Sequence, residues 1–144
     1  MTKNEKYLEI ARAVSALSKD PSSQVGAVII GTGGEGGPWG YNGAPRGCDA
    51  DIDHRMERPE KYYWIEHAER NAIFTAARTG FNTVGSTMVV THAPCMDCAR
   101  AIVQAGIKKV IFPDPTPEFF ERWKEHVERA VLLFNETNVD VEIV

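Results

Sequence analysis

The residues whose types and spacing point most clearly to a chemical function are one histidine and two cysteines, which lie in two short motifs. His67–Glu69 (His-Ala-Glu) contains the first, and Pro94–Cys98 (Pro-Cys-Met-Asp-Cys) contains the other two. Imidazole and thiolate are preferred ligands of Zn²⁺, and structural zinc sites take four such ligands, whereas a catalytic site keeps three and leaves a position for water. The sequence therefore predicts a catalytic zinc at His67, Cys95 and Cys98.

Glu69 lies two residues after the histidine and is the candidate proton carrier. On a helix it points in a different direction from His67, so it need not bind the metal. Zinc lowers the pKa of a bound water from about 15.7 toward about 7. A carboxylate beside that water can move its protons, which is worth about 10²–10⁴-fold in rate. We therefore predict hydrolytic chemistry with Glu69 as the catalytic residue.

The cysteines of this chain also fit less specific roles. A structural zinc with His54 or Cys48 as fourth ligand would close the site, but it would give Glu69 no role. A Cys-x-x-Cys redox pair is another possibility, although Pro94 and the upstream His-x-Glu disfavour it. A second zinc at Cys48, His54 and Glu66 is also conceivable, although these residues lack the tight spacing of a metal motif.

The elements that position the motifs follow from the hydropathy pattern. Helical spacing of apolar residues predicts helices over 4–17, 67–79, 95–104 and 117–134. Short β-branched runs predict strands over 25–30, 87–91, 109–112 and 139–144. A further strand is expected to start within or to span 39–42, after a glycine-rich turn at 31–37. The polar composition of segment 44–63 predicts a long functional loop. Alternating strands and helices indicate an α/β layered sheet, in a single domain over 1–144.

Both motifs fall at the start of a predicted helix. Free N–H groups and the positive end of the helix dipole point outward there, and they favour thiolate over thiol. Cys95 and Cys98 are three residues apart and share one face of their helix. Pro94 suits the beginning of that helix. The local structure thus supports metal binding by both cysteines.

Charge and composition narrow the classes of function. The 144 residues carry a net charge of −4 with both signs interspersed, which disfavours a nucleic-acid surface because such a surface needs a basic stripe. No apolar run approaches the roughly 20 residues of a membrane span, and the first six residues lack the apolar segment of a signal peptide. Three cysteines, two of them in one motif, fit a reducing compartment. We expect a cytoplasmic protein with neither nucleic-acid nor membrane partners.

The two motifs together match the H-x-E and P-C-x-x-C signature of zinc nucleobase deaminases. At these residues the chain resembles the cytidine/deoxycytidylate deaminase superfamily, and within it the deoxycytidylate (dCMP) deaminase branch. The likeness covers nearly the whole chain, through the segments Ser18–Val28, Gly40–Cys48, His67–Ile73, Thr91–Ala99 and Ala105–Phe112. Of these, Ser18–Val28 and Gly40–Cys48 point to the dCMP branch.

The resemblance implies a three-layer α/β/α sandwich with a mixed, roughly five-stranded central sheet. It implies attack of water on the amino-bearing carbon of the ring, with Glu69 passing a proton to the ring nitrogen and then to the departing ammonia. The implied reaction converts dCMP to dUMP for thymidylate synthesis. The branch further implies a homo-oligomer, with a hexamer favoured, and regulation by dCTP as activator and dTTP as inhibitor.

The resemblance also suggests residues that contact the substrate. The Ala68 N–H and the region of Pro94 would hold the pyrimidine edge, and Asn42 or its neighbours would meet the deoxyribose. Candidates for the 5′-phosphate are Lys19, Ser22 and Ser23, although a solvated helix end would account for them equally well. The family often continues after Phe112 with Asp and Tyr next to a basic residue that grips phosphate, whereas this chain reads Pro113–Phe119 (Pro-Asp-Pro-Thr-Pro-Glu-Phe).

An effector site is implied near the second of the segments that point to the dCMP branch. Its candidates are Asn42, Gly43, Arg46 and Gly47, although Arg46 would also fit an ordinary exposed loop.

Two rival functions share the fold. One is a deaminase of free cytidine, deoxycytidine or tRNA adenosine, although the acidic balance argues against tRNA. The other is a catalytically silent nucleotide sensor, which intact His67, Glu69, Cys95 and Cys98 disfavour.

Overall fold

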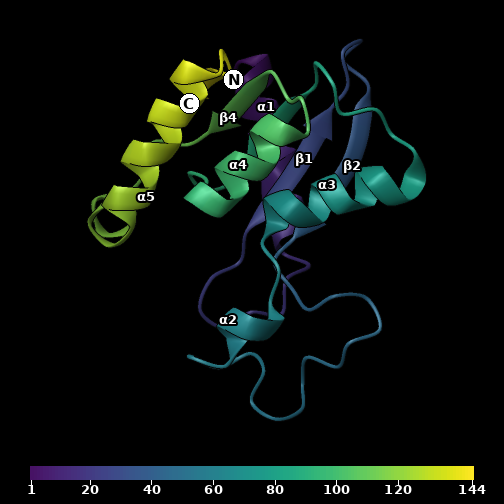
Figure 1. The fold of residues 1–144 in the computed structure, drawn as a ribbon, viewed down its shortest axis with the longest axis vertical. Helices are drawn as coiled ribbons and strands as arrows, with labels where there is room; N and C mark the ends of the chain where they lie inside the picture. Colours follow the sequence, from purple (N-terminus) through teal and green to yellow (C-terminus); the bar gives the residue numbers. More distant parts are fainter.

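A mixed five-stranded sheet forms the centre of the computed structural model, which describes residues 1–144 (Figure 1). The strands are β1 (Gly26–Ile30), β2 (Gly36–Tyr41), β3 (Thr87–Val90), β4 (Lys109–Phe112) and β5 (Asp140–Ile143), in the order β2-β1-β3-β4-β5. β1 pairs antiparallel with β2 and β3, whereas β3, β4 and β5 run parallel. The predicted mixed α/β sheet is thereby confirmed.

Five helices accompany the sheet: α1 (Lys3–Ser15), α2 (Lys61–Trp64), α3 (Ala68–Thr79), α4 (Met96–Gln104) and α5 (Pro117–Glu136). The ends of the four long helices lie within two residues of the predicted ones. Gly80 ends α3 with φ at 77°, and Gly106 follows α4 with φ at 79°; glycine adopts this left-handed conformation without steric cost. None of the helices combines the length and the hydropathy that crossing a membrane requires.

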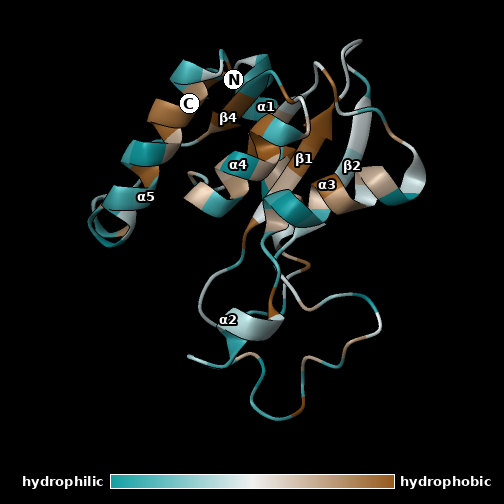
Figure 2. Ribbon diagram, viewed as in Figure 1, coloured by the Kyte–Doolittle hydropathy of each residue, from teal (hydrophilic) through white to brown (hydrophobic).

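The helices cover the two faces of the sheet unequally. α1 packs alone on one face, where its Leu8, Ala11 and Val14 contact a cluster that includes Val28 and Ile30 of β1. α3, α4 and α5 cover the opposite face, which holds the larger core (Figures 1 and 2). Because successive strand side chains point to opposite faces, β1 contributes to both cores and all five of its residues are buried.

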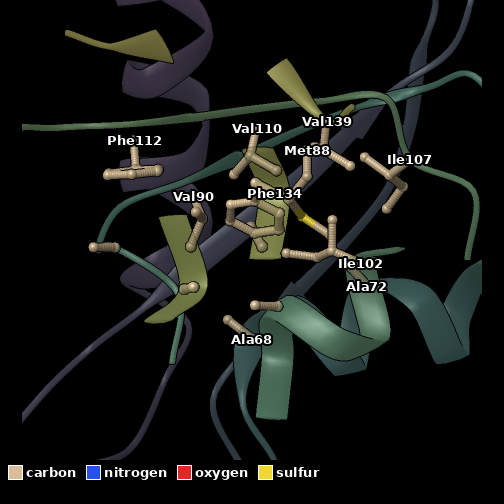
Figure 3. Close-up of a cluster of buried hydrophobic side chains, with 14 of the residues drawn as sticks. Ala68, Ala72, Met88, Val90, Ile102, Ile107, Val110, Phe112, Phe134 and Val139 are labelled. Atoms are coloured by element: carbon tan, nitrogen blue, oxygen red, sulfur yellow. The ribbon is translucent and has the colours of Figure 1, made fainter. Parts of the chain in front are cut away.

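The larger core lies behind the helices that carry the two chemical motifs. Figure 3 shows Ala68 and Ala72 of α3 and Ile102 of α4 beside Met88, Val110 and other buried side chains of the sheet. Ala68, Ala72 and Ile102 are fully buried. Both helices are therefore anchored against the same sheet.

β2 begins at Gly36, earlier than predicted, because its glycines lie within the strand and not in the turn before it. A Cβ atom on Gly40 would lie 2.3 Å from the Ala72 nitrogen and 2.4 Å from the Ala68 carbonyl oxygen. Glycine at this position therefore lets α3 lie directly against the strand. The first residue of α3, which follows His67, is held in place by this contact.

Candidate active site

Three metal-binding side chains meet where the N-termini of α3 and α4 adjoin. His67 is the N-cap of α3, Cys95 is the N-cap of α4, and Cys98 lies in the first turn of α4. His67 Nδ1 is 3.4 Å from the Cys95 sulfur and 3.4 Å from the Cys98 sulfur. Their ligand atoms all lie within 4.8 Å of one another, so the three residues are positioned to bind one metal ion.

The spacing and chemistry of this donor set fit Zn²⁺. Zinc bonds of about 2.3 Å to sulfur and about 2.0–2.1 Å to nitrogen, at a tetrahedral angle, place the two donors roughly 3.6 Å apart. The two observed separations of 3.4 Å are close to that value. No fourth His, Cys, Asp or Glu joins the group, which is the ligand count of a catalytic zinc site.

The residues considered for a structural or second zinc do not come together. The Cys48 sulfur accepts a hydrogen bond from Arg55 Nη1 at 3.5 Å. His54 Nδ1 lies 2.8 Å from Glu57, and Glu66 pairs with an arginine of α3. None of the three belongs to a group that could hold a metal ion. The structure therefore gives no support to a zinc at Cys48, His54 and Glu66.

The three ligand side chains compete for protons. A hydrogen bond from Cys98, followed by one from His67, lowers the pKa of Cys95 to about 4 against the opposing effect of burial. The same Cys95–Cys98 hydrogen bond, together with burial, raises the pKa of Cys98, and the hydrogen bond to Cys95 raises the pKa of His67. Metal binding requires thiolate and neutral imidazole, so a bound cation resolves this competition by displacing protons.

Glu69 is buried beside this triad, with 5% of its surface exposed. Burial raises the pKa of Glu69 to about 7, and the negative charge of Cys95 adds to the effect. A carboxyl group whose pKa lies near the working pH can both accept and donate a proton. Glu69 therefore has the position and the proton affinity of a general acid and base.

A cavity of about 640 Å³ is lined by Glu69 and by two of the three metal-binding residues, His67 and Cys95. Its wall combines residues from the segment after α1, the long loop before α3, the starts of α3 and α4, and one face of α5. Among the residues predicted to contact substrate, the lining includes Ser22, Ser23, Asn42, Ala68 and Pro94. Lys19 is exposed and outside the lining, and the lysine that lines the cavity is Lys61.

Lys61 forms a buried ion pair with Asp20 that joins the long loop to the segment after α1. Its Nζ lies 3.0 Å from Asp20 Oδ2, and the two side chains are 10% and 2% exposed. Asp20 also accepts hydrogen bonds from the backbone N–H groups of Ser22 and Ser23. Burial alone would raise the pKa of Asp20, but the N–H of Ser22 and the ammonium of Lys61 outweigh it and lower that pKa.

Asn42, which directly follows β2, hydrogen-bonds through its side chain to the segment after α1. Its Nδ2 donates to the Ser23 carbonyl oxygen at 2.8 Å, and its Oδ1 accepts from the Val25 N–H at 2.8 Å. The Asn42 side chain therefore fixes the backbone of the cavity wall. The sequence predicts a substrate contact for Asn42, which lines the cavity, but it does not predict the pairing of Asp20 and Lys61, which are separated by 41 residues.

A row of aromatic rings lines the side of the cavity formed by α5. The rings of His92 and Phe119 lie 5.4 Å apart, those of Phe119 and Trp123 6.3 Å, and those of Trp123 and His126 5.5 Å. His126 Nδ1 also accepts a hydrogen bond from the Met96 N–H at 3.1 Å, which joins α5 to the start of α4. Sequence reasoning predicts this helix but does not assign it to the site.

A second cavity, of about 790 Å³, lies on the outer side of β2 and α3. It contains two of the predicted effector residues, Gly43 and Arg46, together with Trp39, Tyr41 and Arg78. Arg46 Nη2 donates to Thr75 Oγ1 at 2.9 Å. Of the remaining effector candidates, Asn42 lines the first cavity and Gly47 lines neither.

Comparison with known proteins agrees with this geometry. Residues 1–113 match the family model described as the cytidine and deoxycytidylate deaminase zinc-binding region. The chain is 40% identical over 139 residues to an uncharacterized deaminase in the luxG 3′ region of Aliivibrio fischeri, covering 95% of this chain and 90% of that protein. It is 40% identical over 115 residues to mouse deoxycytidylate deaminase, covering 75% of this chain and 62% of the mouse protein.

A solved structure with the same fold is the dCMP deaminase of cyanophage S-TIM5 in complex with dCMP and dUMP. It superposes with a TM-score of 0.78 at 27% identity, over 100% of this chain and 99% of that one. The superposition therefore extends over the entire sheet and over both helices whose N-termini carry the zinc ligands and Glu69.

Proposed function

This chain belongs to the cytidine and deoxycytidylate deaminase family, and within that family of hydrolytic deaminases we propose that it converts dCMP to dUMP and ammonia. The observation that carries the proposal is the position of Glu69, which is buried next to a three-ligand metal site and lines the same cavity as His67 and Cys95. The mouse and cyanophage relatives support dCMP as the substrate.

The residues of the chain have distinct tasks in this reaction. Zn²⁺, when bound by His67, Cys95 and Cys98, supplies a Lewis acid that makes water nucleophilic at neutral pH. Glu69 accepts a proton from the attacking water and transfers it to the ring nitrogen. It then takes the proton of the new hydroxyl group on the attacked carbon and donates it to the amino group, which leaves as ammonia while the carbonyl forms. The nearly complete burial of Glu69 excludes other water from this proton transfer.

Other residues orient the pyrimidine. Ala68 occupies the first position of α3, so its N–H has no partner within the helix and is available for an oxygen on the pyrimidine edge. Pro94 lines the same end of the cavity. The rings of His92 and Phe119 offer a surface on which a planar base can stack. Ser22, Ser23 and Asn42 also line the cavity and are the proposed contacts of the sugar and phosphate.

Ammonia release from dCMP, deoxycytidine, cytidine and a tRNA anticodon stem-loop tests this assignment. The zinc-loaded protein is expected to act on dCMP at the highest kcat/KM. Glu69→Gln is expected to lower kcat by about 10²–10⁴-fold while zinc content stays unchanged. Glu121→Gln, an exposed change on α5, is the control. Turnover of another substrate without turnover of dCMP would refute the substrate, and normal activity of Glu69→Gln would refute the role of Glu69.

We further propose that the enzyme is a cytoplasmic homo-oligomer, with a hexamer favoured, that dCTP activates and dTTP inhibits. The outer cavity supports an effector site because Arg46 and Arg78 offer guanidinium groups to phosphates and Trp39 offers a ring to a base. Arg46→Gln is expected to abolish the response to both triphosphates while basal turnover of dCMP persists. A full response in that variant would place the effectors elsewhere. Light scattering reports the subunit number.

A further inference from the structure

The start of α4, which carries both cysteines of the metal site, is held by a side chain of another helix. The first four N–H groups of an α-helix have no partner within the helix. In α4 the N-cap position is occupied by the metal ligand Cys95, whose side chain makes no capping hydrogen bond. The first of the free N–H groups, that of Met96, donates instead to Nδ1 of His126 at 3.1 Å. His126, 30 residues further along the chain, therefore provides the acceptor that the N-cap does not.

The hydrogen bond to His126 acts on the peptide group that joins Cys95 to Met96. The N–H of this group donates to His126, and its C=O, which belongs to Cys95, accepts from the Ala99 N–H at 2.8 Å. Because a peptide group is planar, holding it at both ends limits rotation about the bond between the Cα and the carbonyl carbon of Cys95. His126 thereby restrains the backbone from which Cys95 projects and the helical turn that contains Cys98.

His126 is itself held in one orientation. Its ring lies 5.5 Å from the ring of Trp123 at an interplanar angle of 69°, which is an edge-to-face contact. The side chain is half-buried and lines the cavity that Glu69 also lines. Since Nδ1 accepts a hydrogen bond, the ring hydrogen lies on Nε2. The acceptor atom is therefore aimed at the start of α4 by the packing of α5.

The helix that carries His126 lies outside the region shared with the family. The family model matches residues 1–113, whereas α5 begins at Pro117. In the structure α5 packs against α4 (Figure 1). The match to the zinc-binding region therefore gives no role to His126, and its contact with the cysteine helix is a feature of this chain's own C-terminal part.

We propose that His126 is a positioning residue for the metal site, which holds the peptide after Cys95 and thereby keeps both thiolates in the arrangement that binds zinc. Residues that orient metal ligands typically change metal affinity or activity by about 10–100-fold. The lower end of this range applies, because His126 acts on the backbone of a ligand and not on its sulfur atom. The inference rests on the proposed function only for its kinetic measurement, since zinc binding requires no turnover.

Three substitutions separate the hydrogen-bond acceptor from the size and shape of the side chain. His126→Asn places an oxygen where Nδ1 lies, because both atoms are bonded to Cγ. His126→Phe keeps a ring against Trp123 but has no acceptor. His126→Gln is closer to histidine in size and forms helices better than asparagine, but its oxygen lies one bond further from the backbone. A packing role would therefore make the Asn variant the worst of the three, whereas the acceptor role makes it the best.

Zinc affinity, measured on the purified protein by competition with a chromophoric chelator, tests the inference. It is expected to fall about tenfold in His126→Phe and His126→Gln, and to stay within about twofold of the wild type in His126→Asn. At saturating zinc, kcat for dCMP should follow the same order. Hydrogen exchange of the Met96 amide should be about tenfold faster only in the Phe and Gln variants. Glu121→Asn, an exposed change on α5, is the matched control for asparagine in this helix.

Wild-type zinc affinity in His126→Phe would overturn the inference. A loss in His126→Asn as large as in His126→Gln, with Glu121→Asn unaffected, would overturn it too. Because the Asn and Gln variants both lack the ring, their comparison remains decisive if the Phe variant does not fold. A wild-type protein that binds zinc but leaves dCMP unchanged would instead refute the proposed function, and the order of the zinc affinities would still decide the role of His126.

Discussion

The buried pair of Lys61 and Asp20 should be essential for holding the long loop against the cavity, and Lys61→Met tests this directly. The substitution keeps most of the side-chain volume and removes the positive charge. It leaves the Asp20 carboxylate, only 2% exposed, without its cation. Removing one member of a buried ion pair costs about 3–5 kcal/mol because the other charge stays buried and uncompensated.

The lower end of that range applies here, because the backbone N–H groups of Ser22 and Ser23 still hydrogen-bond to Asp20. We therefore expect Lys61→Met to lower the free energy of unfolding by about 3 kcal/mol, which corresponds to a fall in Tm of roughly 10 °C for a chain of this size. Urea titration and calorimetry measure these quantities. Lys124→Met is the control, because Lys124 is exposed and its carboxylate neighbour lies 3.9 Å away, so its loss should cost less than about 0.5 kcal/mol.

A double-mutant cycle separates the ion pair from other effects of the substitution. Asp20→Asn combined with Lys61→Met should be less destabilising than the sum of the single changes, because the two residues contact each other. The pH dependence follows from the same pair. Since the folded pKa of Asp20 lies below its ordinary value of 3.8, its contribution to stability is present above that value and is lost as pH falls through the folded pKa. Additive single changes, or equal stability of Lys61→Met and Lys124→Met, would refute this account.

Two further predictions concern the metal ligands and the contact that positions them. Cys98→Ser should abolish zinc retention during purification, whereas Cys48→Ser should keep full zinc content and activity, since Cys48 lies outside the ligand group; plasma emission spectroscopy decides between them. Gly40→Ala should lower stability by about 2 kcal/mol or more, because its Cβ would overlap the backbone of α3. Gly36→Ala, whose Cβ would meet nothing within 4 Å, should cost far less, and equal losses in the two variants would contradict the packing argument.

The metal site could be predicted from sequence because its determinants are local. Cys95 and Cys98 share one helix face through their spacing, and His67 and Cys95 each precede an apolar run with helical period. The helix and strand order then follows from the alternating patterns, including the left-handed glycine after α3. What brings His67 to the cysteines is the common sheet beneath α3 and α4, which the family resemblance implies and local patterns do not.

The rest of the cavity depends on contacts between residues distant in sequence. Asp20 and Lys61 are ordinary charged residues until the fold brings them within 3.0 Å, and Lys19 is an equally plausible candidate from sequence alone. The apolar positions of α5 predict a helix, but they do not reveal that its Phe119 and Trp123 line the cavity. The glycines of β2 resemble those of a turn in sequence, because only the packing of α3 shows why Gly40 has no side chain.

The most direct test of the central claim is the zinc stoichiometry and coordination of the purified, active protein, measured by metal analysis and X-ray absorption at the zinc edge. The account predicts one zinc per chain with two sulfur ligands, one nitrogen ligand from His67 and one exchangeable oxygen ligand that no side chain provides. A protein that deaminates without zinc, or a zinc enclosed by four side chains, would contradict it.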